Sequence, residues 1–295
     1  MSLITEVVRE ISKLPRAAKI PVGLFLLVAI FGPMLAPYDP VAQNLLDAKQ
    51  GFSWTHLLGT DNLGRDTLSR LLAAARVSAV GISFVLGIAL AIGVTLGAIA
   101  GFMRGVVDEF IMRLVDVGQS VPSLVVALAV IGVFGTGFDI MILALALAWW
   151  PGYARVSRAV VTSVLQQPHI ETLYVLGAHP ARIFLLHLLP TAIGAVIVYA
   201  SADAGAIALT IATLSFLGLG IQPPTAEWGQ MVVDALPFLE THPLQVLLPG
   251  AALTLVVVGF NVLGEAVALG KTPRPLARRT IRERRTEALK AGLAS

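Results

Sequence analysis

The 295-residue sequence contains no cysteine, which excludes disulfides, thiolate catalysis, iron–sulfur clusters and Cys-ligated zinc. Charged residues are also scarce. Asp, Glu, Lys and Arg make up only 13% of the chain, against about 25% in ordinary soluble domains. Hydrophobic residues make up 56%. A chain this poor in charge and this rich in apolar residues is typical of a membrane protein.

Long apolar tracts occupy most of the sequence. A helix needs roughly 20 mainly apolar residues to cross a bilayer, and the candidate tracts are 18–36, 77–102, 114–134, 139–154, 190–215 and 244–269. The first follows Arg16 and Lys19 as a signal peptide would, but it ends in Ala36-Pro37-Tyr38 without a small-residue cleavage site. We therefore expect an uncleaved first span and an all-α, polytopic membrane protein with six transmembrane helices.

The distribution of Lys and Arg predicts the orientation. If the N-terminus is cytoplasmic, every Lys and Arg falls in a cytoplasmic segment except Lys49, Arg65, Arg70 and Arg76. This is the positive-inside pattern. Both termini are then cytoplasmic, and the basic stretch "RRTIRERR" is expected to be a solvated helix near anionic headgroups.

The spans divide the chain into three parts. Residues 1–76 hold the N-terminal cytoplasmic segment, the first span and an extracytoplasmic interfacial segment. Residues 77–270 form a five-helix core with a cytoplasmic loop at 166–190, and residues 271–295 form a basic cytoplasmic tail.

Two regions are expected outside the membrane. In residues 55–76, apolar residues recur at helical spacing and Asp66 can pair with Arg70 one turn on, which predicts an interfacial helix before the second span. In "GLGIQPPTAEWGQMVVDALPFLETHP", Thr225 is a plausible N-cap with Glu227 in the first turn. This loop could meet a soluble partner, plug the pathway or simply pack, and the candidate contacts are Glu227, Trp228 and Asp234.

Two other patterns are rejected. "GEAVALGKT", Gly264 to Thr272, resembles a phosphate-binding P-loop, but it has five residues instead of four before Gly-Lys-Thr and ends an apolar helix. His169, His179 and His187 lack the paired carboxylates or cysteines of a metal site. We expect no catalytic residue, no metal site and no cofactor bound by this chain.

The loop "HIETLYVLGAHPARIFLLHLLP", residues 169–190, has the pattern of two short helices. The first runs from about His169 to Leu176, and Gly177 allows the backbone to turn. Pro180 can start a second helix, in which Ile183, Leu186 and Leu189 form an apolar stripe. A cytoplasmic loop this structured indicates docking into a groove of another protein.

Asp203 lies within the fifth span, in "YASADAGAIAL". A charge at the centre of a membrane helix costs about 2.5–3.5 kcal/mol on insertion scales and usually faces a cavity or a partner. We therefore expect Asp203 to face the pathway, and the alternative is a buried polar residue bonded to a neighbouring helix.

The spacing of Glu171, Gly177 and Leu189-Pro190 resembles the EAA loop of permease subunits in binding-protein-dependent ABC importers. Thr172-Leu173 replaces its Ala-Ala, and the His187-x-Leu-Pro ending resembles the peptide/nickel branch. The chain is similar to the C-type permeases of that branch in five further stretches, although its C-terminal Gly264-Glu265 segment departs from the family pattern. These stretches are "LGTDNLGRDTLSRLL", "VDEFIMRLVDVGQSVPSL", "WWPGYARVSRAV", "SFLGLGIQPPTAEWG" and "LPGAALTLVVVGFNVLGE".

The resemblance implies a type I ABC importer permease fold in the bacterial cytoplasmic (inner) membrane and a transport role without bond chemistry. The implied partners are a second homologous permease, two ATPase subunits that bind ATP and magnesium, an extracytoplasmic substrate-binding protein and membrane lipid, but no nucleic acid. The implied docking-loop residues are Glu171, Thr172, Leu173, Gly177, Ala178, Leu189 and Pro190.

The implied substrates are di- or oligopeptides, with nickel or a metal chelate as the alternative. A stand-alone secondary transporter or channel is the competing class, but the sequence shows no internal repeat and few intramembrane ionisable residues. A membrane-embedded hydrolase would need a Ser/His/Asp or HExxH arrangement, which is missing.

Overall fold

The computed structural model describes residues 16–271, with side chains over 20–267, and the regular elements of that part of the chain are helices. The predicted basic tail therefore lies outside the described residues. The principal helices are α2 Arg16–Leu35, α3 Thr67–Met103, α4 Gly105–Ser120, α5 Ser123–Phe134, α6 Phe138–Leu165, α7 Pro168–Val175, α8 Pro180–Ile183, α9 Leu189–Phe216, α10 Trp228–Ala235 and α11 Leu244–Lys271. Three short segments complete the order: η1 Leu45–Asp47, the π-helical η2 Phe184–Leu188 and η3 Leu236–Phe238.

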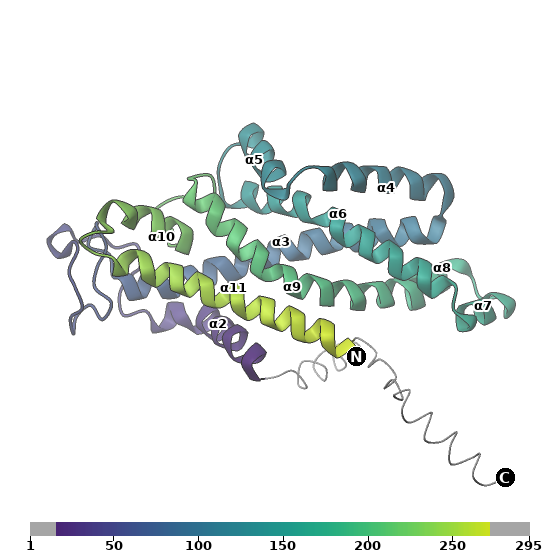
Figure 1. The fold of residues 1–295 in the computed structure, drawn as a ribbon, viewed down its shortest axis with the longest axis horizontal. Coiled ribbons are helices and arrows are strands. Elements are labelled where there is room, and N and C mark those ends of the chain that lie inside the picture. The colour runs from purple at the N-terminus through teal and green to yellow at the C-terminus, as the bar shows by residue number, and fades with distance from the viewer. Residues whose placement is uncertain (1–15, 272–295) are drawn as a thin grey trace, which may run out of the picture.

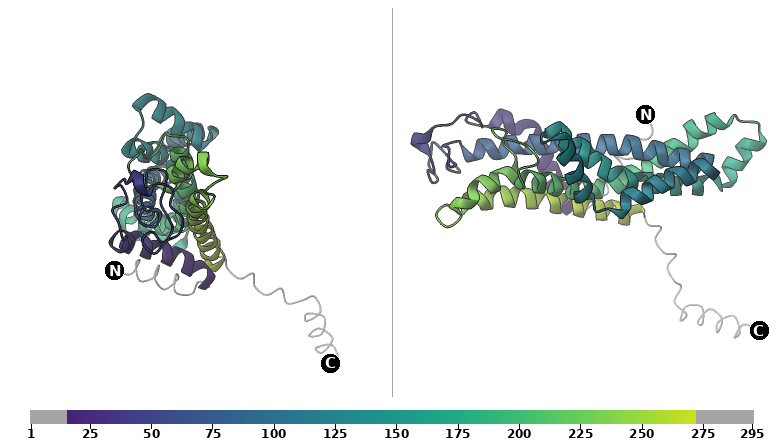
Figure 2. Two further views of the ribbon diagram at one scale, coloured as in Figure 1. Left: turned by 90° about the vertical axis from the view of Figure 1, so that its left-hand side faces the viewer. Right: turned by 90° about the horizontal axis from the view of Figure 1, so that it is seen from above.

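The long helices α3, α6, α9 and α11 run along the long axis of an elongated bundle (Figure 1). The irregular segment before α3 and helix α10 lie at one end of this axis, and α7 and α8 lie at the other end (Figure 1 and the right view of Figure 2). The two loop regions singled out from the sequence therefore occupy opposite ends of the molecule.

Four helices are long and apolar enough to cross a membrane: Thr67–Met103, Phe138–Leu165, the continuous Pro180–Phe216 and Leu244–Val267. The first predicted tract forms a shorter apolar helix, Ile20–Leu35. It falls below the usual length for a straight span and contains Pro21 and Pro33.

The third predicted tract, 114–134, is not one straight helix. It is divided between α4 and α5, which form a bent pair with an angle of 92°. Val121 is extended at the break, with φ −105° and ψ 133°, and Pro122 follows it. Proline lacks an N–H and disfavours the helical conformation of the preceding residue, which explains why the apolar pattern continues while the helix does not.

The predicted interfacial helix within 55–76 is wrong in its first half. Residues 55–66 are irregular, and α3 begins only at Thr67 and then continues unbroken into the span. Asp66 caps this helix, because its carboxylate accepts hydrogen bonds from the backbone N–H (2.8 Å) and the hydroxyl (2.7 Å) of Ser69. The predicted Asp66–Arg70 pair is therefore replaced by a cap, and Arg70 contacts other carboxylates.

The backbones of α3 and α6 approach closely along one stripe of small residues. Gly93, Gly97 and Gly101 recur every fourth position on α3, and a Cβ atom at each would lie within 3 Å of a backbone carbonyl oxygen of α6. The closest is Gly97, where a Cβ would meet the Ala154 oxygen at 2.1 Å. Ser157 adds a hydrogen bond from its hydroxyl to the Val94 oxygen (2.9 Å). Small residues at this spacing allow helices in a membrane to pack by close van der Waals contact.

We expect Gly97→Ala to destabilise the chain, because overpacking a close contact typically costs about 1–3 kcal/mol and the opposing atom is backbone that cannot rotate away. Gly87→Ala is a matched control on the same helix, since a Cβ there has nothing within 4 Å. The thermal transition of the detergent-solubilised protein, followed by fluorescence-detected size exclusion, should fall for Gly97→Ala and not for Gly87→Ala. Equal transitions would show that α3 and α6 are not packed this closely.

Candidate functional sites

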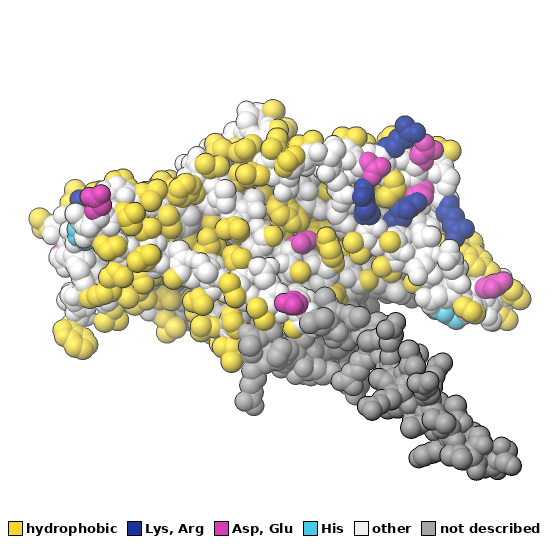
Figure 3. All heavy atoms as spheres, viewed as in Figure 1, with side chains coloured by type: hydrophobic (Ala, Val, Ile, Leu, Met, Phe, Trp, Pro, Cys, Tyr) yellow, Lys and Arg dark blue, Asp and Glu magenta, His cyan; other side chains and the backbone are white. Residues whose placement is uncertain are grey.

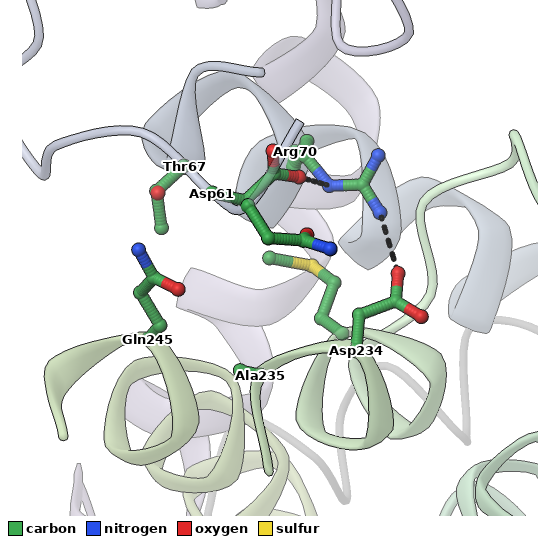
Figure 4. Close-up of a pocket in the computed structure, with 8 residues that line it drawn as sticks. Asp61, Thr67, Arg70, Asp234, Ala235 and Gln245 are labelled. Atoms are coloured by element: carbon green, nitrogen blue, oxygen red, sulfur yellow. Dashed lines mark ion pairs between the residues drawn. The ribbon is translucent and has the colours of Figure 1, made fainter. Parts of the chain in front are cut away.

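A buried ionic cluster lies at the end of the bundle that carries α10. Arg65 and Arg70 are each only 2% exposed. Arg65 Nε contacts the Asp61 carboxylate at 2.6 Å, and Arg70 Nε contacts the same group at 3.4 Å. Asp234 of α10 lies 3.3 Å from Arg65 and 3.9 Å from Arg70. Figure 4 shows Arg70 between these two carboxylates, so the cluster joins the segment before α3 to α10.

Gln245 adds a second link between the same regions. Its side-chain amide donates a hydrogen bond of 2.6 Å to the Thr60 carbonyl oxygen, which connects the first turn of α11 to the segment before α3. Asp234 also accepts a 2.9 Å hydrogen bond from Gln230. The Gln245 contact is buried and the Asp234 contact is partly buried, so removing one partner would leave a polar group without compensation.

Helix α10 begins differently from the sequence-based prediction. Glu227, not Thr225, is its N-cap, and the carboxylate accepts a 3.1 Å hydrogen bond from the backbone N–H of Gln230. The Glu227 side chain is fully buried, and burial raises its pKa despite this bond. Trp228 is 3% exposed, and its indole N–H donates to the Leu71 oxygen at 3.3 Å.

The three predicted outer-loop contacts therefore have internal partners. Glu227 and Trp228 are buried, and Asp234 pairs with the two buried arginines. Sequence reasoning gave no role to Arg65 or to the carboxylate of Asp61, which come from a short irregular segment. Only their approach to α10 reveals the cluster.

At the opposite end, α7 forms the first part of the predicted docking loop. It runs over Pro168–Val175, close to the predicted His169–Leu176, with Pro168 at its first turn. Gly177 has φ +78°, which confirms the turn predicted there. Ile170 is fully buried in a cluster with Val161, Ile183 and other residues of α6 and the second loop helix. This side chain anchors α7 to the bundle.

The second loop helix starts at Pro180 as predicted, with His179 as N-cap. It ends after one turn, and the π-helical segment η2 joins it to α9. The predicted stripe of Ile183, Leu186 and Leu189 is wrong at its centre: Ile183 is buried, Leu186 is 59% exposed and Leu188 is fully buried instead. The wider π turn changes which side chains face the core, and a regular helical period does not anticipate it.

The residues predicted to dock divide into two groups. Glu171, Thr172 and Gly177 are exposed, while Leu173, Ala178, Leu189 and Pro190 are half-buried against the bundle. Glu171 lies in the first turn of α7, where its charge is favourable for the helix. Val175, which the sequence-based assignment did not include, is 81% exposed, and Leu176 is 75% exposed. With Tyr174, they make the free side of α7 apolar.

Ion pairs connect α4 and α6 near this loop. Arg158 pairs with Asp108, and Arg155 pairs with Asp116. On the face shown in Figure 3, Lys and Arg side chains gather at the end of the molecule near α7 and α8, whereas the middle is mainly apolar. This distribution agrees with a bilayer crossed along the long axis.

Asp203 lies in the middle of α9 and is half-buried. Its carboxylate is near the hydroxyl of Tyr153 on α6, a fully buried side chain, although the two atoms do not make a hydrogen bond of regular geometry. The rings of Tyr153 and Tyr199 meet edge to face, with centroids 6.1 Å apart. Asp203 thus belongs to a small polar group between α6 and α9, and the pathway role stays a prediction.

Long apolar helices that run side by side, a helical loop at one end and an ordered cap at the other are typical of a polytopic membrane protein. Residues 93–270 match the family described as binding-protein-dependent transport system inner membrane component. Residues 17–52 match the N-terminal transmembrane domain of oligopeptide transport permease C. The chain belongs to this family of inner membrane permeases of ABC importers, in its C-type peptide/nickel branch.

Several relatives align with most of this chain. The nickel transport system permease protein NikC of Escherichia coli K12 is 40% identical over 252 residues, covering 85% of this chain and 91% of the relative. The oligopeptide permease OppC of Bacillus subtilis is 35% identical over 264 residues, covering 89% and 86%. The glutathione permease GsiD of Pectobacterium atrosepticum is 37% identical over 262 residues, covering 88% and 86%.

Family membership places the chain in the inner membrane as a multi-pass permease that is not itself catalytic. It also implies ATPase and binding-protein partners. The stand-alone transporter and the membrane-embedded hydrolase are thereby excluded.

Glu227 should make stability depend on pH. A carboxyl group whose pKa is higher in the folded chain than in the unfolded one stabilises the folded state while the group is protonated. Stability should therefore decline as pH rises above the ordinary glutamate pKa of about 4.3 and level off beyond the raised pKa. Glu227→Gln removes the ionisation and keeps an oxygen acceptor for the cap. Thermal transitions across pH should show a smaller decline in the variant, and parallel curves would contradict the role of burial.

Gly177 should require a residue that tolerates positive φ. A β-branched side chain at φ +78° is strained by about 1–2 kcal/mol, whereas Asn visits this region more readily. Gly177→Val should lower binding-protein-stimulated ATP hydrolysis at normal expression, and Gly177→Asn should largely keep it. A Val variant as active as the Asn variant would show that this turn can change without consequence.

Proposed function

We propose that this chain is one of two related permeases in an importer that takes up di- or oligopeptides delivered by an extracytoplasmic binding protein, with energy from two ATPase subunits. The fold is the type I importer permease fold, with six spans formed by α2, α3, the bent pair α4–α5, α6, α9 and α11. Both termini are cytoplasmic, which is supported by the positive-inside pattern of Lys and Arg.

The main observation that supports this proposal is the exposed side of α7. Tyr174, Val175 and Leu176 form an apolar surface at an end of the bundle that, in the proposed orientation, lies in water. Such a surface on a membrane protein's aqueous end marks a protein contact. A short helix with apolar anchors and an acidic residue at its start suits a groove in an ATPase subunit.

The anchoring of α7 supports coupling. Buried Ile170 packs with residues of α6 and of the loop that continues into α9, so force on α7 reaches both spans. Closure of the ATPases would then move α6 and α9 together, and the pathway would face alternate sides. Such coupling needs two distinct sites and an element with two arrangements, and the loop with its two spans is the candidate for that element.

Nickel or a metal chelate is the second candidate cargo. The 40% identity to a nickel permease favours it, whereas the match to an oligopeptide permease domain favours peptides. In such systems the binding protein selects the cargo, so mass spectrometry of the ligand that copurifies with the cognate binding protein distinguishes them. A peptide supports the first proposal, and a metal complex supports the second.

Glu171 tests the docking loop. If Glu171 only stabilises α7 through the helix dipole, worth about 0.3–1 kcal/mol when exposed, Glu171→Gln should have little effect. If it also makes a charge-assisted contact in the ATPase groove, Glu171→Lys should weaken ATPase recruitment or separate hydrolysis from uptake.

The matched control is Glu240→Lys, since Glu240 is an exposed acid at the α10 end of the bundle. Reconstituted transporters should be assayed for ATP hydrolysis and uptake together. Unchanged values for Glu171→Lys would remove this residue from the coupling mechanism.

Asp203 tests the pathway. If its carboxylate faces the moving substrate, Asp203→Asn should alter uptake of cationic or metal-bearing cargo while preserving assembly. If it only interacts with the nearby Tyr153 hydroxyl, Tyr153→Phe should produce the same change as Asp203→Asn. Uptake of several cargo types by reconstituted variants separates the two cases, and full uptake of every cargo by Asp203→Asn would end the pathway proposal.

A further inference from the structure

A cavity of about 470 Å³ lies beside α3, between the start of α6 and the segment that joins α9 to α10. Its volume is in the range of roughly 300–1,000 Å³ that small-molecule sites occupy. Apolar walls come from Val77, Val80, Phe138 and Ile221. None of the roles described above uses this cavity.

Arg76 is the charged residue among those that line the cavity. It is exposed, and within residues 20–267 no carboxylate forms an ion pair with it. Arg65 and Arg70, which lie earlier in the chain, are matched by Asp61 and Asp234. Arg76 also stands directly before the apolar tract 77–102, at an end of the span where a long cationic side chain can reach the membrane interface.

The other polar features of the wall favour an anion. The amide nitrogen of Gln222 donates to the Gly218 and Gly220 carbonyl oxygens, at 2.9 Å and 3.3 Å, so the guanidinium of Arg76 supplies the charged donors. Gly137 and Phe138 bring the N-terminus of the 28-residue helix α6 to the cavity. The positive end of a helix dipole attracts negative charge. Asp139 lies in the first turn of α6 but does not line the cavity.

We propose that this Arg76 cavity is an entry subsite that binds a carboxylate of the imported cargo, while its apolar walls hold the adjoining part of the molecule. The identity of the anion as cargo rests on the proposed function, whereas the preference for an anion rests on the cavity alone. A peptide offers its C-terminal carboxylate, and a metal chelate offers those of its chelator. Arg is suited to this task because its planar donors bind a carboxylate in pairs.

A lipid phosphate is the competing source of negative charge, since Arg76 lies at one end of an apolar tract. The cavity has room for a ligand of small-peptide size, and its rim carries Gln222 and Thr225, which an acyl chain does not require. These features favour cargo over lipid.

The absence of cysteine allows a direct test, because Val80→Cys creates a single thiol in the cavity wall. The thiol is labelled in the assembled transporter in proteoliposomes, with the anionic reagent 2-sulfonatoethyl methanethiosulfonate and its cationic trimethylammonium counterpart. Adding Arg76→Gln should lower the ratio of anionic to cationic rates about fivefold or more, while Arg76→Lys should keep most of it. An unchanged ratio in Arg76→Gln would overturn the anion site.

Thr241→Cys is the matched control thiol, because Thr241 is exposed at the same end of the molecule and does not line the cavity. Its ratio should not respond to Arg76→Gln. A control that changes as much as Val80→Cys would mean that Arg76 alters the general surface potential, which also overturns a local site.

Protection of the Val80→Cys thiol identifies the occupant. Trialanine, glutathione and nickel(II) citrate are compared with trialanine amide, which lacks the carboxylate, in liposomes with and without anionic lipid. Cargo binding is supported if a carboxylated probe protects the thiol and the corresponding amide does not. Protection by none of the three, or protection that follows anionic lipid alone, overturns it. The ligand that copurifies with the cognate binding protein tests the proposed cargo separately, so a charge preference together with a non-peptide ligand there would reject the peptide cargo and keep the anion site.

Discussion

The close contact between α3 and α6 is the constraint on which the rest of the structure depends. Gly93, Gly97 and Gly101 bring one backbone against the other without intervening side chains. Lipid tails are as apolar as the side chains they replace, so helices in a bilayer gain little from burial itself and must pack by close fit. The pair is therefore held by shape complementarity, and there is no space for even one added methyl group at the centre of the stripe.

The two ends of the bundle are built on this pair. At one end, α3 contributes buried Arg70, which lies between Asp61 and Asp234 and fastens α10. At the other end, α6 contributes Arg155 and Arg158 to ion pairs with α4 and then leads directly into α7. Helices α3 and α6 extend along the long axis (Figure 1). The contacts at both ends of the bundle are therefore attached to the same pair of helices.

The few charges of this chain are used in distinct ways. Arg65 and Arg70 are buried and satisfied by carboxylates, so they hold the outer segment together at the cost of desolvation. Glu171 is exposed on a loop, where it can serve a partner. Arg76 and Asp203 lie on spanning helices beside a cavity and beside a tyrosine pair, respectively. In a chain with so little charge, this placement separates residues that support the fold from candidates for transport.

The sequence by itself determined the helical class, the apolar tracts, the two ends of the docking loop and the turn at Gly177. These features follow from local chemistry: apolar length, proline at helix starts and glycine at positive φ. Tertiary structure alone decided the 92° bend at Pro122, the Glu227 cap, the π turn that exposes Leu186 and the partners of Arg70. Pro122 predicts a break locally but not its angle. A local pattern also carries no information about a carboxylate more than 160 residues away, as Asp234 is from Arg70.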